Sequence, residues 1–367
     1  MFVVRAHGTT FPCVPLSRIV SVAFVFILVA NNVLYQTSLQ VNQISLVVAL
    51  IAVCLFFNVH AVNKKFLILI SISSLIYLVT LFFLDGVAER NRAIFFYSSS
   101  VLYLLLIFNG HKISVPDSFL YFYLVIFFVI SILILSTSDR DFVNPNWISA
   151  TFFFLLAFSK PMRRRKMVFF LLIGLILSAL VYESRGSTVI FGVALLAMVS
   201  QRLFGDAIAK RLYLFVYLLF VIAFWFFLNL LSSEFGYFMD FIFQFSDRGL
   251  GGRESALIQG YLDLKESGYI GAGPASSGGY IDPSNNQPVH IHFGFLDIAL
   301  KFSILSVLFV LILMRAVILK ASFQQFPMVA ASFMTVFFYN GIAFSHFGLN
   351  VFVIALMSKV LFSKANI

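Results

Sequence analysis

Apolar runs of close to 20 residues recur along the whole chain, and they constrain its fold more than any other feature. A helix of about 20 apolar residues is long enough to cross the hydrocarbon core of a bilayer. The mean hydropathy of +1.00 over 367 residues is too high for a soluble globular protein. Because the runs are continuous and do not alternate, they also exclude a membrane-spanning β-barrel. The sequence therefore predicts an all-α polytopic integral membrane protein.

We expect a single transmembrane domain over residues 1–367, with about twelve helices. The first apolar run lacks a small-x-small cleavage site, so we interpret it as a retained helix and not as a removed signal peptide. The expected spans are 19–35, 41–58, 66–84, 93–109, 118–136, 145–160, 167–183, 186–204, 211–231, 293–314, 325–343 and 347–362.

The charged residues predict which side of the membrane each loop occupies. With the N-terminus inside and alternating spans, one side receives 17 of the 25 basic residues but only two acidic ones, Asp117 and Asp206. Cytoplasmic loops carry an excess of lysine and arginine, so both termini and the basic run 160–166 are expected in the cytoplasm. That run is a topology signal first, and a lipid-headgroup site is the minor alternative. The same distribution accounts for the net charge of +10 without a nucleic-acid partner.

One long polar stretch, residues 232–292, interrupts the apolar runs and is expected as a large periplasmic loop. It holds half of the 20 glycines. Its glycine-rich segments 271–274 and 278–280 are interpreted as turns. Residues 253–267 predict an amphipathic helix lying on the membrane. The apolar side of that helix consists of Leu257, Ile258, Tyr261, Leu262 and Leu264.

Arg185 stands between two apolar runs, in the segment Glu183-Ser-Arg-Gly-Ser187. An arginine at membrane level is costly unless it is paired or faces water. Its guanidinium is suited to bind a phosphate or carboxylate through two parallel hydrogen bonds. A salt bridge with Glu183, or extension of the side chain to the lipid headgroups, is the structural alternative.

Two further arginines, Arg248 and Arg253, flank a glycine run that ends at Gly252. Arg253 opens the predicted amphipathic helix, where its charge adds to the positive end of the helix dipole. This arrangement suits an anion, and Arg248, Gly252 and Tyr280 are candidate substrate contacts beside it. A solvated loop charge is the alternative for both arginines. No Walker lysine follows the glycines, so no ATP-binding loop is predicted.

Two histidines, His290 and His292, close the polar stretch just before the next apolar run. No third ligand lies nearby, and neither cysteine (Cys13, Cys54) is in the stretch, so no metal site is predicted. Because imidazole titrates near neutral pH, a general base is the better interpretation. The position of His292 at the mouth of the helix favours it, and His290 stays open as the alternative. His346, in the last outer turn, is a further candidate for substrate binding in the same cavity.

Three short blocks follow one another in a specific order, spacing and sidedness. The first is Ser184-Arg185-Gly186 at the start of a span. The second is Gly252-Arg253, opening an outer helix that runs into Gly271-Ala-Gly273, and the third is His292-Phe-Gly-Phe295-Leu296 at the start of the next span. Together they resemble the superfamily of O-antigen polymerases and O-antigen ligases, which are bacterial inner-membrane glycosyltransferases. Phe293 departs from the asparagine of that family, and Ser303 and Ser306 stand where its glycines are common.

The resemblance implies a metal-independent sugar transfer, without a cofactor, from an undecaprenyl-diphosphate-linked oligosaccharide. Arg185 and Arg253 would hold the charge of the leaving diphosphate, and His292 would accept the proton of the acceptor hydroxyl. A polymerase of O-antigen or a related surface polysaccharide is favoured, with its active site facing the periplasm of a Gram-negative bacterium. Such an enzyme lies among membrane lipids and would work beside a chain-length regulator and a flippase.

Two other functions stay open at the level of sequence. The ligase uses the same type of donor and transfers finished polymer to the lipid A–core sugar. A secondary transporter, including one that flips lipid-linked sugars, belongs to a different class but shares the span count and the cytoplasmic termini. Against transport, no two-half repeat is visible, and the ionisable residues cluster at the outer rim and not near the midplane.

Overall fold

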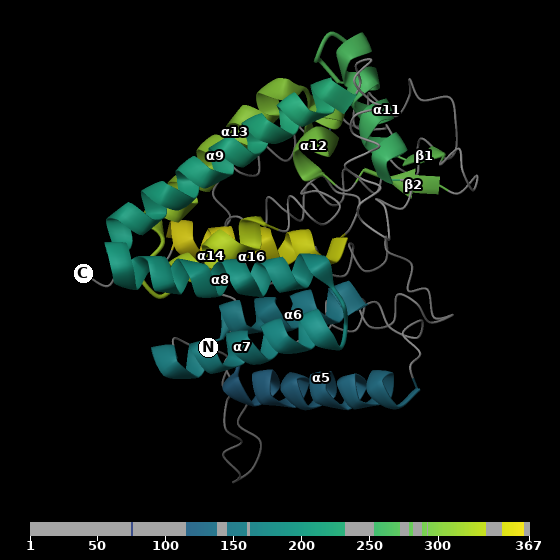
Figure 1. Ribbon diagram of the computed structural model, residues 1–367. Coiled ribbons are helices and arrows are strands. Elements are labelled where there is room, and N and C mark those ends of the chain that lie inside the picture. The colour runs from purple at the N-terminus through teal and green to yellow at the C-terminus, as the bar shows by residue number, and fades with distance from the viewer. Residues whose placement is uncertain are drawn as a thin grey trace, which may run out of the picture.

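The structure is a computed structural model, and it is largely helical (Figure 1). The expected spans 19–35, 41–58 and 93–109 lie outside the described residues, and of 66–84 only Leu75 is described. The parts of the chain that the structure describes are residues 75, 115–137, 145–159, 162–231, 253–271, 279–281, 288–291, 293–334 and 347–362.

Five helices between residues 117 and 231 confirm the expected order of apolar segments. Three of them, α5, α8 and α9, are long and apolar enough to cross a membrane. α9 begins five residues before the expected start at 211. The bounds of the five are α5 Asp117–Thr137, α6 Pro145–Phe158, α7 Arg164–Leu180, α8 Arg185–Phe204 and α9 Asp206–Leu231.

The long polar stretch contains one helix and a small hairpin in its described parts. α11 spans Arg253–Glu266, in agreement with the helix expected at 253–267. The turn expected at 278–280 is wrong, because β1 (Gly279–Ile281) pairs antiparallel with β2 (Pro288–His290). In this ladder Gly279 is opposite His290 and Tyr280 is opposite Val289.

The single helix expected at 293–314 is wrong. The structure has two helices there, α12 (Gly294–Phe302) and α13 (Ile304–Lys320). They are separated by Ser303, whose φ of 105° lies in the left-handed region and interrupts the helical path. α12 packs against α11, whereas α13 runs along α9 (Figure 1).

Two helices near the C-terminal end complete the described bundle. α14 spans Phe326–Phe333, so only the first part of the span expected at 325–343 is described. α16 spans Phe347–Phe362 and coincides with the expected 347–362.

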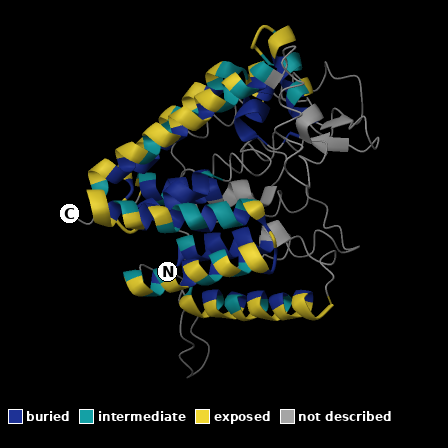
Figure 2. Cartoon of the chain, in the orientation of Figure 1, coloured by how far each residue is buried: buried dark blue, intermediate teal, exposed yellow. Residues whose placement is uncertain are grey.

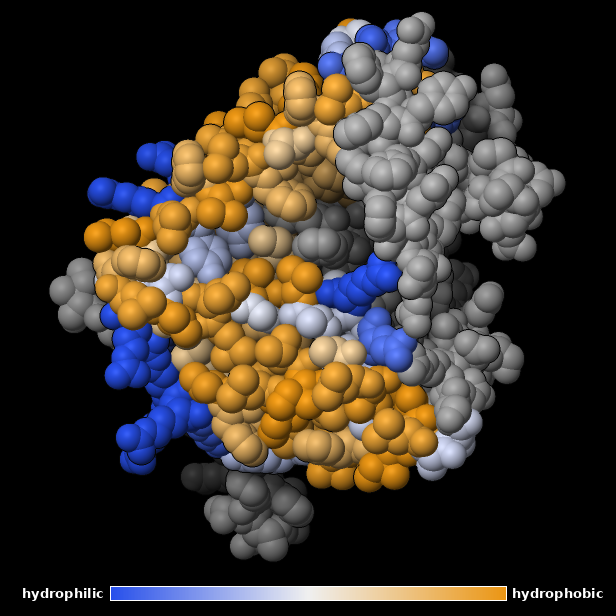
Figure 3. Space-filling view, viewed as in Figure 1, coloured by the Kyte–Doolittle hydropathy of each residue, from blue (hydrophilic) through white to orange (hydrophobic). Residues whose placement is uncertain are grey.

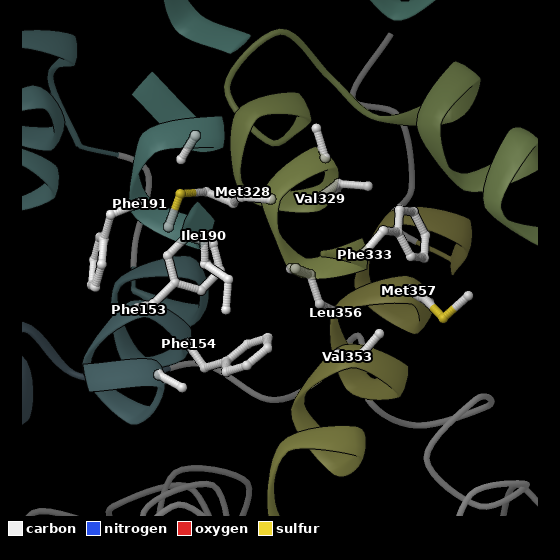
Figure 4. Packing of buried hydrophobic residues seen from close by; sticks show 14 of the residues in the cluster. Phe153, Phe154, Ile190, Phe191, Met328, Val329, Phe333, Val353, Leu356 and Met357 are labelled. Atoms are coloured by element: carbon white, nitrogen blue, oxygen red, sulfur yellow. The ribbon is translucent and has the colours of Figure 1, made fainter. Parts of the chain in front are cut away.

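The core lies where α6, α8, α14 and α16 meet. Figure 4 shows Phe153 and Phe154 of α6 beside Ile190 and Phe191 of α8, facing Met328 of α14. The described side chains of α6 and α14 are buried almost throughout, whereas α5, α8 and α9 carry buried residues on one side and exposed residues on the other (Figure 2). Many of the outward residues are large and apolar, especially on α5 and α9, as expected for helices that face lipid.

The ends of several helices are joined at a basic end of the bundle. Arg164, in the first turn of α7, donates to the carbonyl oxygen of Met198 near the end of α8. Lys210 Nζ of α9 donates to the carbonyl oxygen of Ala321, just after α13, at 2.6 Å. Lys359 Nζ of α16 donates to the carbonyl oxygen of Phe158, the last residue of α6, at 3.4 Å. We call this the basic end, and Figure 3 shows hydrophilic side chains gathered along that side of the molecule.

Candidate functional site

Arg185 is the first residue of α8, and a capping interaction defines that start. Ser184 is the N-cap, and its hydroxyl accepts a hydrogen bond from the backbone N–H of Ser187 at 3.3 Å. The N–H of Ser184 donates in turn to the carbonyl oxygen of Ser178 at 2.9 Å, which closes the tight connection from α7. The Ser-Arg-Gly block is therefore a helix start, as expected from the sequence.

The guanidinium of Arg185 is exposed. Within the described part of the chain, no ion pair joins Arg185 to Glu183, so the salt bridge considered above is not formed. Because α8 ends at the basic end, Arg185 lies at the opposite end of the bundle. Figure 1 shows this start of α8 on the same side as α11, β1 and β2.

Arg253 and His290 belong to elements that pack together, α11 and the β1–β2 hairpin. We call α11, the hairpin and α12 the outer layer. Arg253 is the first residue of α11 and His290 is the last residue of β2, and α11 packs against both strands of the hairpin. α11 also packs against α9 and α12. Tyr280 lies in β1, next to the strand that carries His290. Arg248, Gly252, His292 and His346 lie outside the described residues.

Three of the five residues of the apolar side of α11 pack on protein, whereas Ile258 and Leu262 are half-buried. Leu257, Tyr261 and Leu264 are buried among the described residues. The hydroxyl of Tyr261 donates to Asn229 Oδ1 near the end of α9 at 3.3 Å. Burial raises the pKa of Tyr261, and the neighbouring Tyr269 raises it further, so the phenol stays a neutral donor at working pH. α11 is thus fixed to α9 at the end of the bundle opposite the basic end.

The turn after α11 inserts into the break between α12 and α13. The carbonyl oxygen of Tyr269 accepts a hydrogen bond from the N–H of Ile304 at 3.1 Å. Gly271, with φ of 94°, lies against the last turn of α12, where the carbonyl oxygens of Ala299 and Leu300 leave no room for a side chain. The glycine of the Gly-x-Gly block is therefore required by both its backbone angle and its close approach to α12.

A buried ion pair in α12 was missed by the sequence analysis. Lys301 Nζ lies 2.8 Å from Asp297 Oδ1, and the two side chains are 6% and 4% exposed. The signal was an aspartate and a lysine four residues apart, directly after the His292 block. We expected one continuous span over 293–314 and assigned these two residues no role in it.

The described residues hold no group of three histidine, cysteine, aspartate or glutamate side chains placed to bind a metal ion. The absence of a metal in the reaction stays a prediction.

Comparison of the chain with protein-family models, with curated proteins and with solved structures finds no match.

Proposed function

We propose that this chain is a membrane glycosyltransferase that joins undecaprenyl-diphosphate-linked oligosaccharide units into O-antigen or a related surface polysaccharide. The single observation that carries the proposal is the exposed guanidinium of Arg185. It lies at the end of the bundle opposite the basic end, without an ion-pair partner among the described residues. A charge kept available in this way is suited to an anionic substrate group.

The outer layer supplies the remaining groups of the proposed site. α11 begins at Arg253, and β2 ends at His290, two residues before His292. The packing of α11 against β1, β2 and α12 keeps these two segments of the chain near each other. An arginine at the start of a helix and a histidine after a neighbouring strand are a suitable pair for a diphosphate and a reacting hydroxyl.

The proposed reaction needs two kinds of assistance. The acceptor hydroxyl attacks the anomeric carbon of the donor sugar, its proton passes to His292, and the bond from that carbon to the diphosphate oxygen breaks. Negative charge then accumulates on the leaving diphosphate, and Arg185 and Arg253 stabilise it by charge-assisted hydrogen bonds.

The proposal is tested in a Gram-negative strain that forms a ladder of O-antigen lengths only when it produces this protein. Wild type is compared with Arg185→Ala, Arg253→Ala, His292→Ala and His290→Ala at matched membrane levels, on lipopolysaccharide gels. We expect Arg185→Ala, Arg253→Ala and His292→Ala each to lower polymer formation by roughly 100-fold, leaving one repeat unit on the core. His290→Ala should keep the ladder.

Matched controls use other charged residues of the same helices. Arg202 is exposed in the last turn of α8, and Lys265 is exposed in the last turn of α11. Alanine at either position should leave the ladder unchanged. Bare core with accumulated lipid-linked polymer would identify a ligase instead. A ladder that survives every substitution would favour the transporter and reject this site.

The proposed orientation has its own test. Cys13 and Cys54 are replaced by serine, and a single cysteine is introduced as Arg202→Cys or Glu266→Cys, both at exposed positions. A membrane-impermeant maleimide added to cells with a permeabilised outer membrane should label position 266 and not position 202. The reverse labelling pattern would place the proposed site in the cytoplasm and contradict the proposal.

A further inference from the structure

Packing alone does not explain why α12 contains a buried ion pair. α12 has nine residues, and those from Gly294 to Lys301 are all buried, Asp297 and Lys301 included. Removing two charges from water costs more than their mutual attraction returns unless their geometry is very good. Apolar side chains of similar size would fill the same space at lower cost, and 61% of this chain is hydrophobic.

What an ion pair supplies, and two apolar residues do not, is one defined arrangement. Lys301 Nζ contacts both carboxylate oxygens of Asp297, at 2.8 Å and 3.1 Å. Asp297 lies toward the start of α12 and Lys301 toward its end, which is the favourable order of charges along a helix dipole. The pair therefore stabilises α12 as a helix of defined length that ends at Phe302, just before the break.

Both ends of α12 are in contact with neighbouring elements of the fold. At its start, the ring of Phe293 stacks on Phe224 of α9, with centroids 3.5 Å apart. The chain before Phe293 leads back to His292 and to β2. At its end, Ala299 and Leu300 lie against Gly271, in the turn that follows α11. α12 thus connects the segment that carries the histidines to the helix that begins at Arg253.

We infer that Asp297 and Lys301 are positioning residues, whose ion pair fixes the length of α12 and thereby the spacing between the turn after α11 and the chain that carries His292. The inference rests on the proposed function, because it assigns the pair a role in the geometry of that site. Neither residue is assigned contact with the substrate. The effect of the pair is on the distance between the groups that bind the diphosphate and the group that accepts the proton.

The test separates this role from a purely structural one by comparing single and double substitutions. Asp297→Leu alone leaves Lys301 buried without its carboxylate, and we expect a lower melting temperature in detergent together with lower activity. Asp297→Leu with Lys301→Met removes both charges, and its melting temperature should return to within about 2 °C of wild type. If the pair positions the site, transfer should stay low in this double variant although its fold is restored.

The measurement is polymer formation by purified protein in proteoliposomes, at varied concentrations of lipid-linked repeat unit. We expect kcat of the double variant to fall at least about tenfold while KM for the donor stays within about twofold, because binding groups are kept and only their alignment is lost. A matched control is Gln259→Ala with Asp263→Ala, which removes the 3.1 Å contact of the same spacing on α11. This control should keep the wild-type kcat.

Two results would overturn the inference. Wild-type kcat in the double variant would show that the charges are dispensable for alignment, and activity that follows melting temperature through all variants would show a structural role only. Failure of the proposed function looks different. In that case wild type forms no polymer, or Arg185→Ala and His292→Ala retain full activity, whatever the pair variants do.

Discussion

Gly271 lies so close to Leu300 that a Cβ built on the glycine would stand 2.6 Å from the Leu300 carbonyl oxygen. These residues belong to segments almost 30 positions apart, the turn after α11 and the last turn of α12. Backbone meets backbone at this point, so neither side can yield by turning a side chain. The contact fixes the outer layer more firmly than side-chain packing alone would.

Gly271→Ala should therefore be strongly destabilising. We expect a loss of about 2–4 kcal/mol in the free energy of unfolding, from the clash and from the left-handed backbone angle together. Gly268 is the control, because its φ of 64° is also left-handed but a Cβ there meets nothing within 4 Å. Gly268→Ala should cost only about 1 kcal/mol, measured by thermal unfolding in detergent. Equal losses at the two positions would mean that the contact with Leu300 contributes nothing.

Ser303→Gly should stabilise the protein. Ser303 has φ of 105°, a conformation that glycine adopts without a steric penalty, and the relief should exceed the added chain entropy by about 0.5–1 kcal/mol. Ser306 lies inside α13, where the same change should cost about 0.5 kcal/mol through lower helix propensity. The measurement is the shift in melting temperature of each single variant. A Ser303→Gly protein that melts below wild type would contradict the break described here.

Gly174 allows α7 and α8 to approach closely. A Cβ on this glycine would lie 2.3 Å from the ring of Phe191, which is fully buried. Gly174→Ala should lower the free energy of unfolding by roughly 1–3 kcal/mol through overpacking. Phe191→Leu introduced with it should recover part of that loss, giving a non-additive double-mutant cycle.

The control for this pair is Gly192→Ala on α8. A Cβ there meets nothing within 4 Å, so alanine should be neutral or should stabilise the helix by up to about 1 kcal/mol. Additive effects of Gly174→Ala and Phe191→Leu in thermal unfolding would show that the two residues do not meet.

Lys210→Met should lower the free energy of unfolding by removing bonds at the basic end. Its ammonium group lies 2.6 Å from Asp206 Oδ2 as well as from the Ala321 carbonyl oxygen, and it joins α9 to the end of α13. Loss of these bonds should cost roughly 1–3 kcal/mol. Arg211 is the next residue and is exposed, so Arg211→Met should stay within about 0.5 kcal/mol. The check is chemical denaturation in mixed micelles, and a larger effect at 211 than at 210 would contradict the assignment.

The apolar helices were predictable because residues close to their ends in the sequence determine where they begin and end. α8 begins after Ser184, a residue that caps helices, and the sequence pattern places that start within one residue. The beginning of α9 was predicted too late because the charged residues Asp206 and Lys210 were left outside the span expected at 211–231. Lys210 lies in the first turns of α9, where its long side chain lets the ammonium group reach Asp206 and Ala321.

The break at Ser303 could not be predicted from local sequence. No glycine or proline marks it, and Ser303 is flanked by apolar residues on both sides. The bond from Ile304 to Tyr269 and the contact with Gly271 come from a distant segment and determine where α12 ends. The separate helix that carries Asp297 and Lys301 could not be predicted either, because it exists only where this break interrupts the apolar run. Of the candidate site, the helix starts at Arg185 and Arg253 were predictable, whereas the layer that surrounds them was not.

The uneven attachment of α9 has a mechanical consequence. Lys210, Tyr213 and Tyr217, all in its first half, donate hydrogen bonds to carbonyl oxygens of the surrounding bundle. Its last turns instead carry α11, through Trp225 and Asn229. A helix of 26 residues is about 39 Å long, so a tilt of about 5° around its bonded half would move its far end by about 2 Å. A small tilt of α9 at the basic end would therefore shift the contacts of Trp225 and Asn229 with α11.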